Sequence, residues 1–324
     1  MTSGTSGAIT LSVIVPVYNS EKTISDLIVQ LRPVLQAAAT AYEVILVNDG
    51  SRDGSWGVIE KLVQQYEFVC GINLMRNYGQ HNALLAGIRQ ARHELIVTLD
   101  DDLQNPPAEI PKLLAQLAAG YDVSYGVPQD EQHGFWRDLA SQVTKLTLQS
   151  AMGAETARNI SAFRAFRTQL RDGFRSYQGS FVSIDVLLTW ATTRFTAVVV
   201  RHDPRAAGLS NYTLRKLINH ALNMMTGFSI LPLQLASLTG FGFTALGLAL
   251  LVFVVGRYLL LGGSVPGFPF LASMIAIFSG AQLFALGIIG EYLARVHFRM
   301  MDKPSYTIRT NTRTDSAYGS VSLP

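Results

Sequence analysis

Cysteine is nearly absent from this chain of 324 residues, which contains only Cys70. A single cysteine excludes an internal disulfide, and His and Cys nowhere cluster with the spacing of a zinc site. The sequence also has no Walker loop and no GxGxxG motif, which excludes the nucleotide-binding loops built on those patterns. The net charge is only +3. This weak excess gives no indication of nucleic acid as a partner.

Charged residues are also scarce, at 15% of the chain, where an ordinary soluble protein has about a quarter. The shortage is local, because Arg257 is the only charged residue between Lys216 and Glu291. Within that stretch, residues 233–261 and 268–289 form apolar runs that reach the roughly 20 residues needed to cross a bilayer. Both runs predict transmembrane helices. Two buried core helices are the alternative, but each run exceeds the usual length of a core helix.

Basic residues flank this pair of apolar runs on both sides. The positive-inside rule places such residues in the cytoplasm. We therefore predict a two-helix hairpin over residues 233–293 in a membrane, with a tail over residues 294–324 and both chain ends in the cytoplasm. Glycines in the runs allow close helix packing and leave a homo-oligomer open. The flanking cations are Arg215, Lys216, Arg295, Arg299 and Lys303.

The segment before the hairpin, residues 212–232, is predicted to hold an amphipathic helix and a linker. One face of this helix is apolar and the opposite face carries Arg215, Lys216, Asn219 and Asn223. Such a helix can lie on a membrane surface, although packing on its own domain is the alternative. The apolar positions are Leu214, Leu217, Ile218, Ala221, Leu222 and Met225.

Short apolar runs alternate with segments of helical period through the first hundred residues. This alternation predicts a Rossmann-like α/β domain over residues 11–211, preceded by a flexible tail over residues 1–10 that lacks the pattern of a signal peptide. In such a doubly wound sheet, ligands bind beyond the carboxyl ends of the strands. The predicted strands are 11–17, 42–48, 69–74, 94–99 and 196–201, and the predicted helices are 21–39, 54–66 and 79–91.

Three consecutive aspartates, Asp100 to Asp102, follow the predicted strand 94–99. Like charges repel one another, and burial raises the cost further, so the run favours a bound cation. Gln104 adds a neutral oxygen ligand two residues later. Carboxylate and amide oxygens suit Mg²⁺ or Mn²⁺, which keep several waters and bridge to substrate phosphates. A solvated turn is the alternative.

Five segments of the chain occur in an order typical of one enzyme family. They are SVIVPVYNSE, YEVILVNDGSRDGS, RNYGQHNALLAGI, LDDDLQNPPAEIP and GYDV. With them, the chain resembles the family 2 glycosyltransferases of GT-A fold. The second apolar run ends in GIIGEYLARV, and this narrows the resemblance to polyprenyl-phosphate glycosyltransferases.

This resemblance implies an enzyme anchored in the inner membrane. It would transfer one sugar, with inversion, from a nucleotide diphosphate sugar (a UDP sugar) to an undecaprenyl-type phosphate for cell-envelope glycans. RNYGQH is most similar to the branch that transfers a modified arabinose.

On the donor side, the resemblance implies roles for individual residues. Asp102 is implied in catalysis as well as in binding. The residues implied in nucleotide-sugar binding are Pro16, Tyr18, Asp49, Arg76, Asp100 and Asp102. Those implied in holding Mg²⁺ or Mn²⁺ against the diphosphate are Asp100, Asp102 and Gln104.

On the acceptor side, Arg137 and Ser141 in WRDLAS match an Arg and a Ser that hold the lipid phosphate. At a spacing of four both lie on one helical face, where guanidinium and hydroxyl can meet one phosphate. Arg205, in RAAGLSNY, matches an arginine on a loop that closes over the diphosphate. The resemblance implies that Arg137 and Arg205 are catalytic.

Some positions depart from the family pattern. Ala162 stands where relatives commonly have an aspartate proposed as catalytic, Pro128 replaces an arginine, and Asn211 replaces a lysine. Glu155 and Asp185 are the obvious substitutes if the reaction needs a protein base.

Two other functions stay open at the level of sequence. A transferase acting on a glycan or a protein would keep the metal site without needing Arg137 and Ser141. A catalytically impaired membrane scaffold would account for Ala162 and Asn211, but drift would also have eroded the aspartate run. A processive polysaccharide synthase is excluded, since the chain has no QxxRW motif and too few spans.

Overall fold

The computed structural model describes the chain in six stretches that belong to two compact units. Residues 1–213 and 303–324 make up the first unit, and residues 214–302 make up the second. The described stretches are residues 8–128, 160–179, 182–203, 231–261, 267–301 and 304–315.

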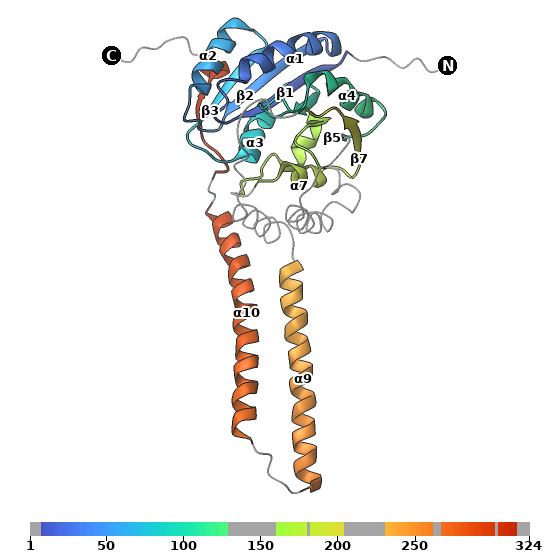
Figure 1. The fold of residues 1–324 in the computed structure, drawn as a ribbon, viewed down its shortest axis with the longest axis vertical. Coiled ribbons are helices and arrows are strands. Elements are labelled where there is room, and N and C mark those ends of the chain that lie inside the picture. The colour runs from blue at the N-terminus through green and yellow to red at the C-terminus, as the bar shows by residue number, and fades with distance from the viewer. Residues whose placement is uncertain are drawn as a thin grey trace, which may run out of the picture. The chain divides into compact units, whose positions relative to one another are not determined.

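The first unit is built on an eight-stranded sheet with the strand order β7-β5-β6-β4-β1-β2-β3-β8 (Figure 1). Strands β1 to β4 run parallel to one another, and β7 is parallel to β5. Strands β6 and β8 are antiparallel to their neighbours. The strands are β1 (Thr10–Val17), β2 (Ala41–Asn48), β3 (Val69–Leu74), β4 (Leu95–Thr98), β5 (Val123–Pro128), β6 (Arg164–Arg167), β7 (Phe195–Val200) and β8 (Ile308–Asn311).

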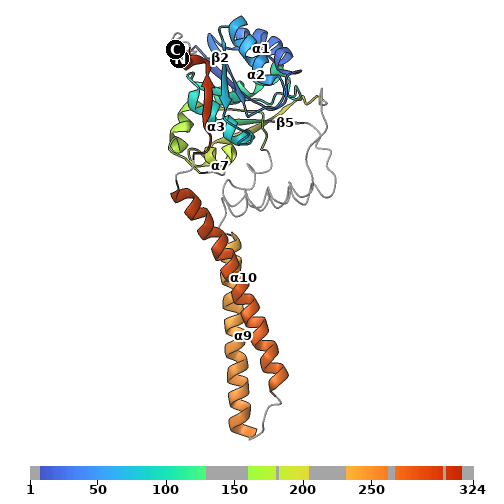
Figure 2. The ribbon, with the colours of Figure 1, turned by 90° about the vertical axis from the view of Figure 1, so that its left-hand side faces the viewer.

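Helices cover both faces of the sheet, as Figures 1 and 2 show. One face packs against α1 (Ile24–Ala38), α2 (Ser55–Gln65) and α4 (Ile110–Ala118). The other face packs against α3 (Gln80–Gln90) and α7 (Ile184–Thr189). The predicted Rossmann-like α/β fold is therefore confirmed.

Helix α1 shows why these segments fold as they do. Its buried residues recur every three or four positions, so they form one apolar stripe against the sheet. They are Ile24, Leu27, Ile28, Leu31 and Leu35.

All five predicted strands and all three predicted helices are present, with ends shifted by a few residues at most. Strands β5, β6 and β8 and helix α4 were not predicted. Strand β6 has the sequence RAFR and opens on Arg164, a residue type that is rarely buried. Here Arg164 is only 2% exposed, because Asp185 of α7 forms an ion pair with it. Such a partner is invisible in the local sequence.

Residues 304–315, which fall within the predicted tail over residues 294–324, include a strand and a short helix. Strand β8 pairs with β3 at one edge of the sheet, and α11 (Thr312–Asp315) follows it. The Thr312 hydroxyl accepts the N–H of Gly71 at 3.0 Å, and Arg313 forms an ion pair with the buried Glu43 of β2. These contacts protect a sheet edge that would otherwise be unpaired.

The second unit contains α9 (Leu231–Leu261) and α10 (Phe268–Met300), two long apolar helices that contact each other. The rings of Phe243 and Phe278 meet edge to face at 6.1 Å. Stretches Leu233–Arg257 and Ile277–Ala294 are long and apolar enough to cross a membrane, and they are unburied within the protein. These two candidate spans match the predicted hairpin, although α10 continues past residue 293.

Several glycines of these helices face away from the partner helix. A Cβ at Gly242, Gly280 or Gly287 meets no atom within 4 Å, whereas one at Gly247 meets Phe278 at 3.0 Å. Oligomer formation through such open positions stays a prediction. The predicted amphipathic helix, Leu214 to Met225, lies outside the described residues.

Candidate active site

A cavity of about 240 Å³ lies at the carboxyl ends of the parallel strands. Strand β1 has β2 on one side and β4 on the other, so the chain order reverses there. A crevice at such a reversal is the usual ligand site of doubly wound folds. Loops after β1, β2, β3 and β4 all contribute to its lining.

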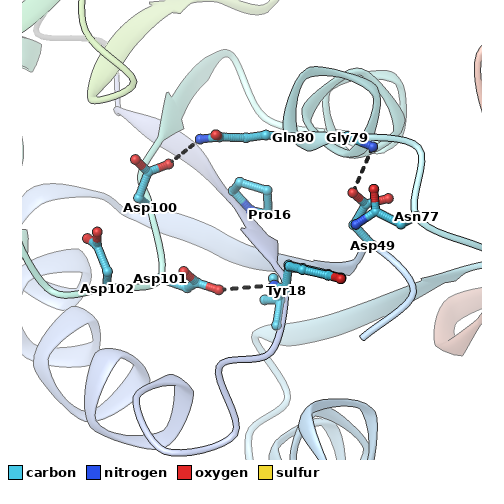
Figure 3. Close-up of a pocket in the computed structure, with 10 residues that line it drawn as sticks. Pro16, Tyr18, Asp49, Asn77, Gly79, Gln80, Asp100, Asp101 and Asp102 are labelled. Carbon is cyan, nitrogen blue, oxygen red and sulfur yellow. Dashed lines mark hydrogen bonds between the residues drawn. The ribbon is translucent and has the colours of Figure 1, made fainter. Parts of the chain in front are cut away.

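The cavity brings together five of the residues predicted from the sequence, which are Pro16, Tyr18, Asp49, Asp100 and Asp102 (Figure 3). The cavity is also lined by Asn77, Gly79, Gln80 and Asp101, which were not among the predicted site residues. Three of the four belong to the segment RNYGQH after β3. The position of this segment directly after a predicted strand is the sequence feature that could have assigned it to the site.

Asp49 holds the turn that follows β3. Its Oδ1 accepts the N–H of Tyr78 at 2.7 Å and its Oδ2 accepts the N–H of Gly79 at 2.8 Å. Burial raises the pKa of Asp49 to about 6, although both hydrogen bonds and the charge of Arg76 favour the carboxylate. Gly50, at φ 65°, lets the two loops approach, since a Cβ there would lie 2.5 Å from the nitrogen of Asn77.

Arg76 lies outside the lining of the cavity. Its guanidinium lies over the ring of Tyr78, 4.3 Å from the ring centroid. Stacking of this kind fixes the direction of a guanidinium on an exposed loop. The predicted contact of Arg76 with the nucleotide sugar stays a prediction.

Of the three aspartates after β4, Asp101 points toward Tyr18 and away from Asp100 and Asp102 (Figure 3). Asp100 Oδ1 accepts a 2.6 Å hydrogen bond from the Gln80 amide, and Asp101 Oδ2 accepts the N–H of Tyr18 at 3.2 Å. Asp102 Oδ1 accepts the N–H of Gln104 at 3.2 Å. Burial raises the pKa of Asp101 to about 6, and the charge of Asp102 acts in the same direction.

Leu103 shapes the loop after β4 that contains residues 100–104, the acidic loop. Its φ of 61° is uncommon for a residue with a branched side chain, and the side chain packs against the hydrophobic core. Core packing therefore maintains the unfavourable backbone conformation between Asp102 and Gln104. Strain of this kind gathers at ligand-binding loops.

The oxygen ligands at this site fit a cation whose coordination is completed by oxygens of the substrate. Among the described residues, no group of three His, Cys, Asp or Glu side chains could enclose a metal ion. Mg²⁺ and Mn²⁺ commonly bind through one or two carboxylates together with waters and phosphates, and Asp100 and Asp102 can supply that pair. Gln104 is not part of the cavity lining, and its predicted role as a ligand stays a prediction.

Residues 202 and 203, which follow β7, contact the acidic loop. The N–H of Asp203 donates to the carbonyl of Gln104 at 2.8 Å, and the His202 ring lies 3.3 Å from the Asn105 amide oxygen. Arg205 follows two residues later. Arg205, Arg137 and Ser141 lie outside the described residues.

Asp185 is poorly placed to serve as a base. It is 5% exposed, accepts the Tyr125 hydroxyl at 3.0 Å and pairs with the Arg164 guanidinium, and it does not line the cavity. The carbonyl of Ala162 accepts the Thr98 hydroxyl at 2.7 Å, which ties that segment to β4. Glu155 lies outside the described residues.

Comparison with known proteins identifies the family. Residues 12–175 match the profile of Glycosyl transferase family 2. The chain belongs to this family. It therefore has a glycosyltransferase domain, and the predicted resemblance to polyprenyl-phosphate glycosyltransferases is confirmed by two relatives of nearly full length.

Both relatives are named undecaprenyl-phosphate 4-deoxy-4-formamido-L-arabinose transferase. The one from Pseudomonas fluorescens is 32% identical over 95% of this chain and 91% of its own length. The one from Shewanella sediminis is 33% identical over 92% of this chain and 91% of its own length.

A solved structure supports the GT-A fold independently. The glucosyl-3-phosphoglycerate synthase of Mycobacterium tuberculosis, crystallised with phosphoglyceric acid, matches with a TM-score of 0.50 at 18% identity. The match covers 67% of this chain and 78% of the synthase. At that identity the similarity concerns the fold alone.

Proposed function

We propose that this glycosyltransferase moves one sugar from a UDP sugar to undecaprenyl phosphate, with inversion at the anomeric carbon. The observation that carries the proposal is the cavity at the reversal of strand order, where Tyr18 and Asp49 meet the pair Asp100 and Asp102. The names of the two relatives support undecaprenyl phosphate as the acceptor and 4-deoxy-4-formamido-L-arabinose as the first sugar to test.

On the donor side, Pro16, Tyr18 and Asp49 hold the base and ribose, and Arg76 contributes from the rim. Tyr18 is 45% exposed, so its ring is free to stack on a base. Asp49 combines this role with its bonds to the turn after β3.

Asp100, Asp102 and Gln104 hold a divalent cation, Mg²⁺ or Mn²⁺, with the diphosphate. When bound, the cation offsets the negative charge that develops on the leaving diphosphate. Asp100 and Asp102 would supply the charged ligands of the cation, and Arg205 would add a second positive charge at the diphosphate.

On the acceptor side, Arg137 and Ser141 hold the lipid phosphate. An acceptor phosphate oxygen forms the bond to the anomeric carbon while the bond to the diphosphate oxygen breaks, and that oxygen keeps the electron pair. Arg137 orients the attacking phosphate and offsets part of its charge. Helices α9 and α10 anchor the enzyme where such a lipid resides, with the first unit in the cytoplasm.

The test is product identification. The purified full-length protein, in lipid nanodiscs with Mn²⁺ and a panel of UDP sugars, is incubated in separate reactions with undecaprenyl phosphate, a glycan or a protein as the acceptor. The products are analysed by mass. We expect a lipid heavier by one sugar residue for one donor. Transfer to a glycan or protein but not to the lipid would reject the proposed acceptor, and absence of transfer from every donor would favour a scaffold.

Arg137→Ala provides the matched variant for the acceptor. Because the proposal gives Arg137 a role on the lipid phosphate and none on the donor, this change should raise the KM for undecaprenyl phosphate about 100-fold and leave the donor KM within a factor of about three. An effect confined to the donor KM would move Arg137 to the other half of the site.

A further inference from the structure

Asp101 is the middle aspartate of the acidic loop, and its side chain points away from its two neighbours (Figure 3). Its Oδ2 accepts the backbone N–H of Tyr18, at 3.2 Å, from a loop 83 positions earlier in the chain. Asp100 instead accepts the Gln80 amide, and Asp102 accepts the N–H of Gln104. The three carboxylates therefore have three different partners.

The loop that Asp101 contacts begins where β1 ends. Asn19 adopts φ 56°, a conformation that non-glycine residues seldom take without support from their surroundings. On one side the loop is bonded to the loop after β2. The Asn19 N–H donates to the Ser51 hydroxyl at 3.0 Å, and the Ser20 N–H donates to the Ser55 hydroxyl at 2.9 Å.

Asp101 supplies the corresponding bond from the loop after β4. The backbone around Tyr18 is therefore hydrogen-bonded on two sides. Ser51 and Ser55 bond to it from the segment after β2, and Asp101 bonds to it from the loop after β4. The ring that Tyr18 presents to the cavity depends on this backbone, because a side chain can be no better placed than the Cα that carries it.

We propose that Asp101 is a positioning residue that acts through Tyr18, and that cation binding is left to Asp100 and Asp102. The inference rests on the proposed function, in which Tyr18 holds the nucleotide. It assigns to the middle carboxylate the task of an oxygen acceptor for the loop after β1, through the Tyr18 N–H and the Ser20 hydroxyl. Its negative charge is not needed for that task.

If Asp101 is a positioning residue, two substitutions of it should differ in effect. If it is a metal ligand, both should impair cation binding. Asp101→Asn keeps an oxygen at the same position and can still accept the Tyr18 N–H, whereas Asp101→Ala cannot. A metal ligand at this position would lose cation affinity in both variants, since an amide is a much weaker ligand for Mg²⁺ or Mn²⁺ than a carboxylate.

The experiment uses the full-length protein in nanodiscs and three measurements. Hydrogen exchange of the peptide that contains Tyr18 reports the proposed bond directly and needs no activity. The second measurement is the affinity for UDP in the presence of Mn²⁺, which reports nucleotide binding. The third is the Mn²⁺ concentration for half-maximal UDP binding, which reports cation binding. Asp100→Asn is the reference for a lost metal ligand, and Asp26→Asn, on the exposed surface of α1, is the control for a lost surface charge.

We expect Asp101→Ala to increase the exchange rate of the Tyr18 peptide and to weaken UDP binding about tenfold, in line with the loss of one hydrogen bond. Its half-maximal Mn²⁺ concentration should stay within about twofold of the wild type, unlike that of Asp100→Asn. Asp101→Asn should recover most of the protection and lose less than about threefold in UDP binding.

Two results would overturn the inference. One is a shift of the Mn²⁺ dependence in Asp101→Asn as large as in Asp100→Asn, which would make Asp101 a ligand. The other is unchanged exchange at Tyr18 in Asp101→Ala. Failure of the proposed function would appear differently, as a wild-type protein that transfers no sugar, and the exchange measurement would still test the bond. If Asp101→Ala does not fold, the Mn²⁺ dependence of Asp101→Asn alone decides.

Discussion

The side-chain amide of Gln80 donates a 2.6 Å hydrogen bond to Asp100, and this joins the first residue of α3 to the acidic loop after β4. The bond orients one carboxylate of the proposed cation site before any ligand arrives. Partners behind a metal ligand set its direction and its basicity, and their loss commonly weakens metal binding about 10- to 100-fold.

The first prediction concerns this partner. Gln80→Ala should raise the Mn²⁺ concentration needed for half-maximal transfer about tenfold, because Asp100 loses the group that orients it. Gln80→Glu should be worse, since a second carboxylate at 2.6 Å would repel the first. Transfer measured across a Mn²⁺ series checks both. Gln90→Ala, at the other end of α3, is the control. Equal Mn²⁺ curves for Gln80→Ala and the wild type would contradict the role.

The second prediction concerns Asp102. Asp102→Asn should lower kcat about 100-fold or more, because cation stabilisation of a leaving diphosphate amounts to several kcal/mol. The fold should persist, since the side chain lies in a cavity and not in the core. Initial rates with Mn²⁺, compared with a thermal melting curve, separate the two effects. Wild-type activity of the variant without added divalent cation would reject the metal site.

The third prediction concerns Asp185, which pairs with Arg164 and Tyr125 inside the fold. Removing one partner of a buried ion pair leaves the other charge unpaired, at a cost of about 3–5 kcal/mol. We expect Asp185→Asn to lower the melting temperature strongly and to leave the single-turnover rate per folded molecule unchanged.

The double variant Asp185→Leu, Arg164→Met serves as the control for this pair. Two apolar residues leave no buried charge, so the double variant should recover part of the lost stability. The opposite pattern in Asp185→Asn, with normal melting and a collapsed chemical step, would make Asp185 the base.

The sequence predicted the central parallel strands because each is a continuous apolar run, which is typical of a strand buried on both faces. It missed β6 and β8 for a physical reason. Strand β6 depends on the pairing of Arg164 with Asp185, and the polar strand β8 depends on the edge of β3 and on Glu43. Both elements are stabilised by partners far away in the chain, and local patterns do not record such partners.

The location of the candidate site was predictable because the carboxyl ends of parallel strands lie at the same edge of the sheet. The acidic run after β4 was assigned because it follows an apolar run, and Asp49 was assigned through the family resemblance. The side-chain partners were not predictable. Nothing in the order of the letters indicates that Gln80 bonds to Asp100 while Asp101 bonds to Tyr18, since those pairings depend on loop conformations such as φ 56° at Asn19.

The fourth prediction concerns pH and Asp49. Burial raises its folded-state pKa from 3.8 to about 6, so the folded protein holds a proton there more tightly than the unfolded chain does. Stability from this group is therefore present below pH 4 and is lost as the pH rises to about 6. Asp49→Asn removes this dependence.

The melting temperature of Asp49→Asn minus that of the wild type should therefore increase between pH 4 and pH 7. The substitution also disturbs the bond to the Tyr78 or the Gly79 N–H, which adds an offset that does not vary with pH. Melting curves of the ligand-free proteins at matched ionic strength check the trend. A difference that stays flat, or that falls with pH, would show that the carboxyl is not destabilised by burial.

The last prediction follows from Ala162, at a position where the family resemblance implies an aspartate, and from the buried position of Asp185. A hydroxyl acceptor needs a base, because its proton must leave as the new bond forms. A phosphate monoester has a second pKa near 6, so most of its oxygens are already deprotonated at pH 7. The attacking group is then an anion that needs orientation by Arg137 and no protein base.

The single-turnover rate at saturating substrates should therefore fall on the acid side in step with protonation of the acceptor. The decisive comparison replaces the acceptor with its phosphonate, in which a methylene group raises the second pKa. If the acceptor phosphate is the titrating group, the acid limb moves to higher pH with the phosphonate. If a protein carboxyl such as Asp49 or Glu155 is responsible, the limb stays where it was. Glu155→Gln completes the test, because a collapsed chemical step with both substrates still bound would identify a base on this chain.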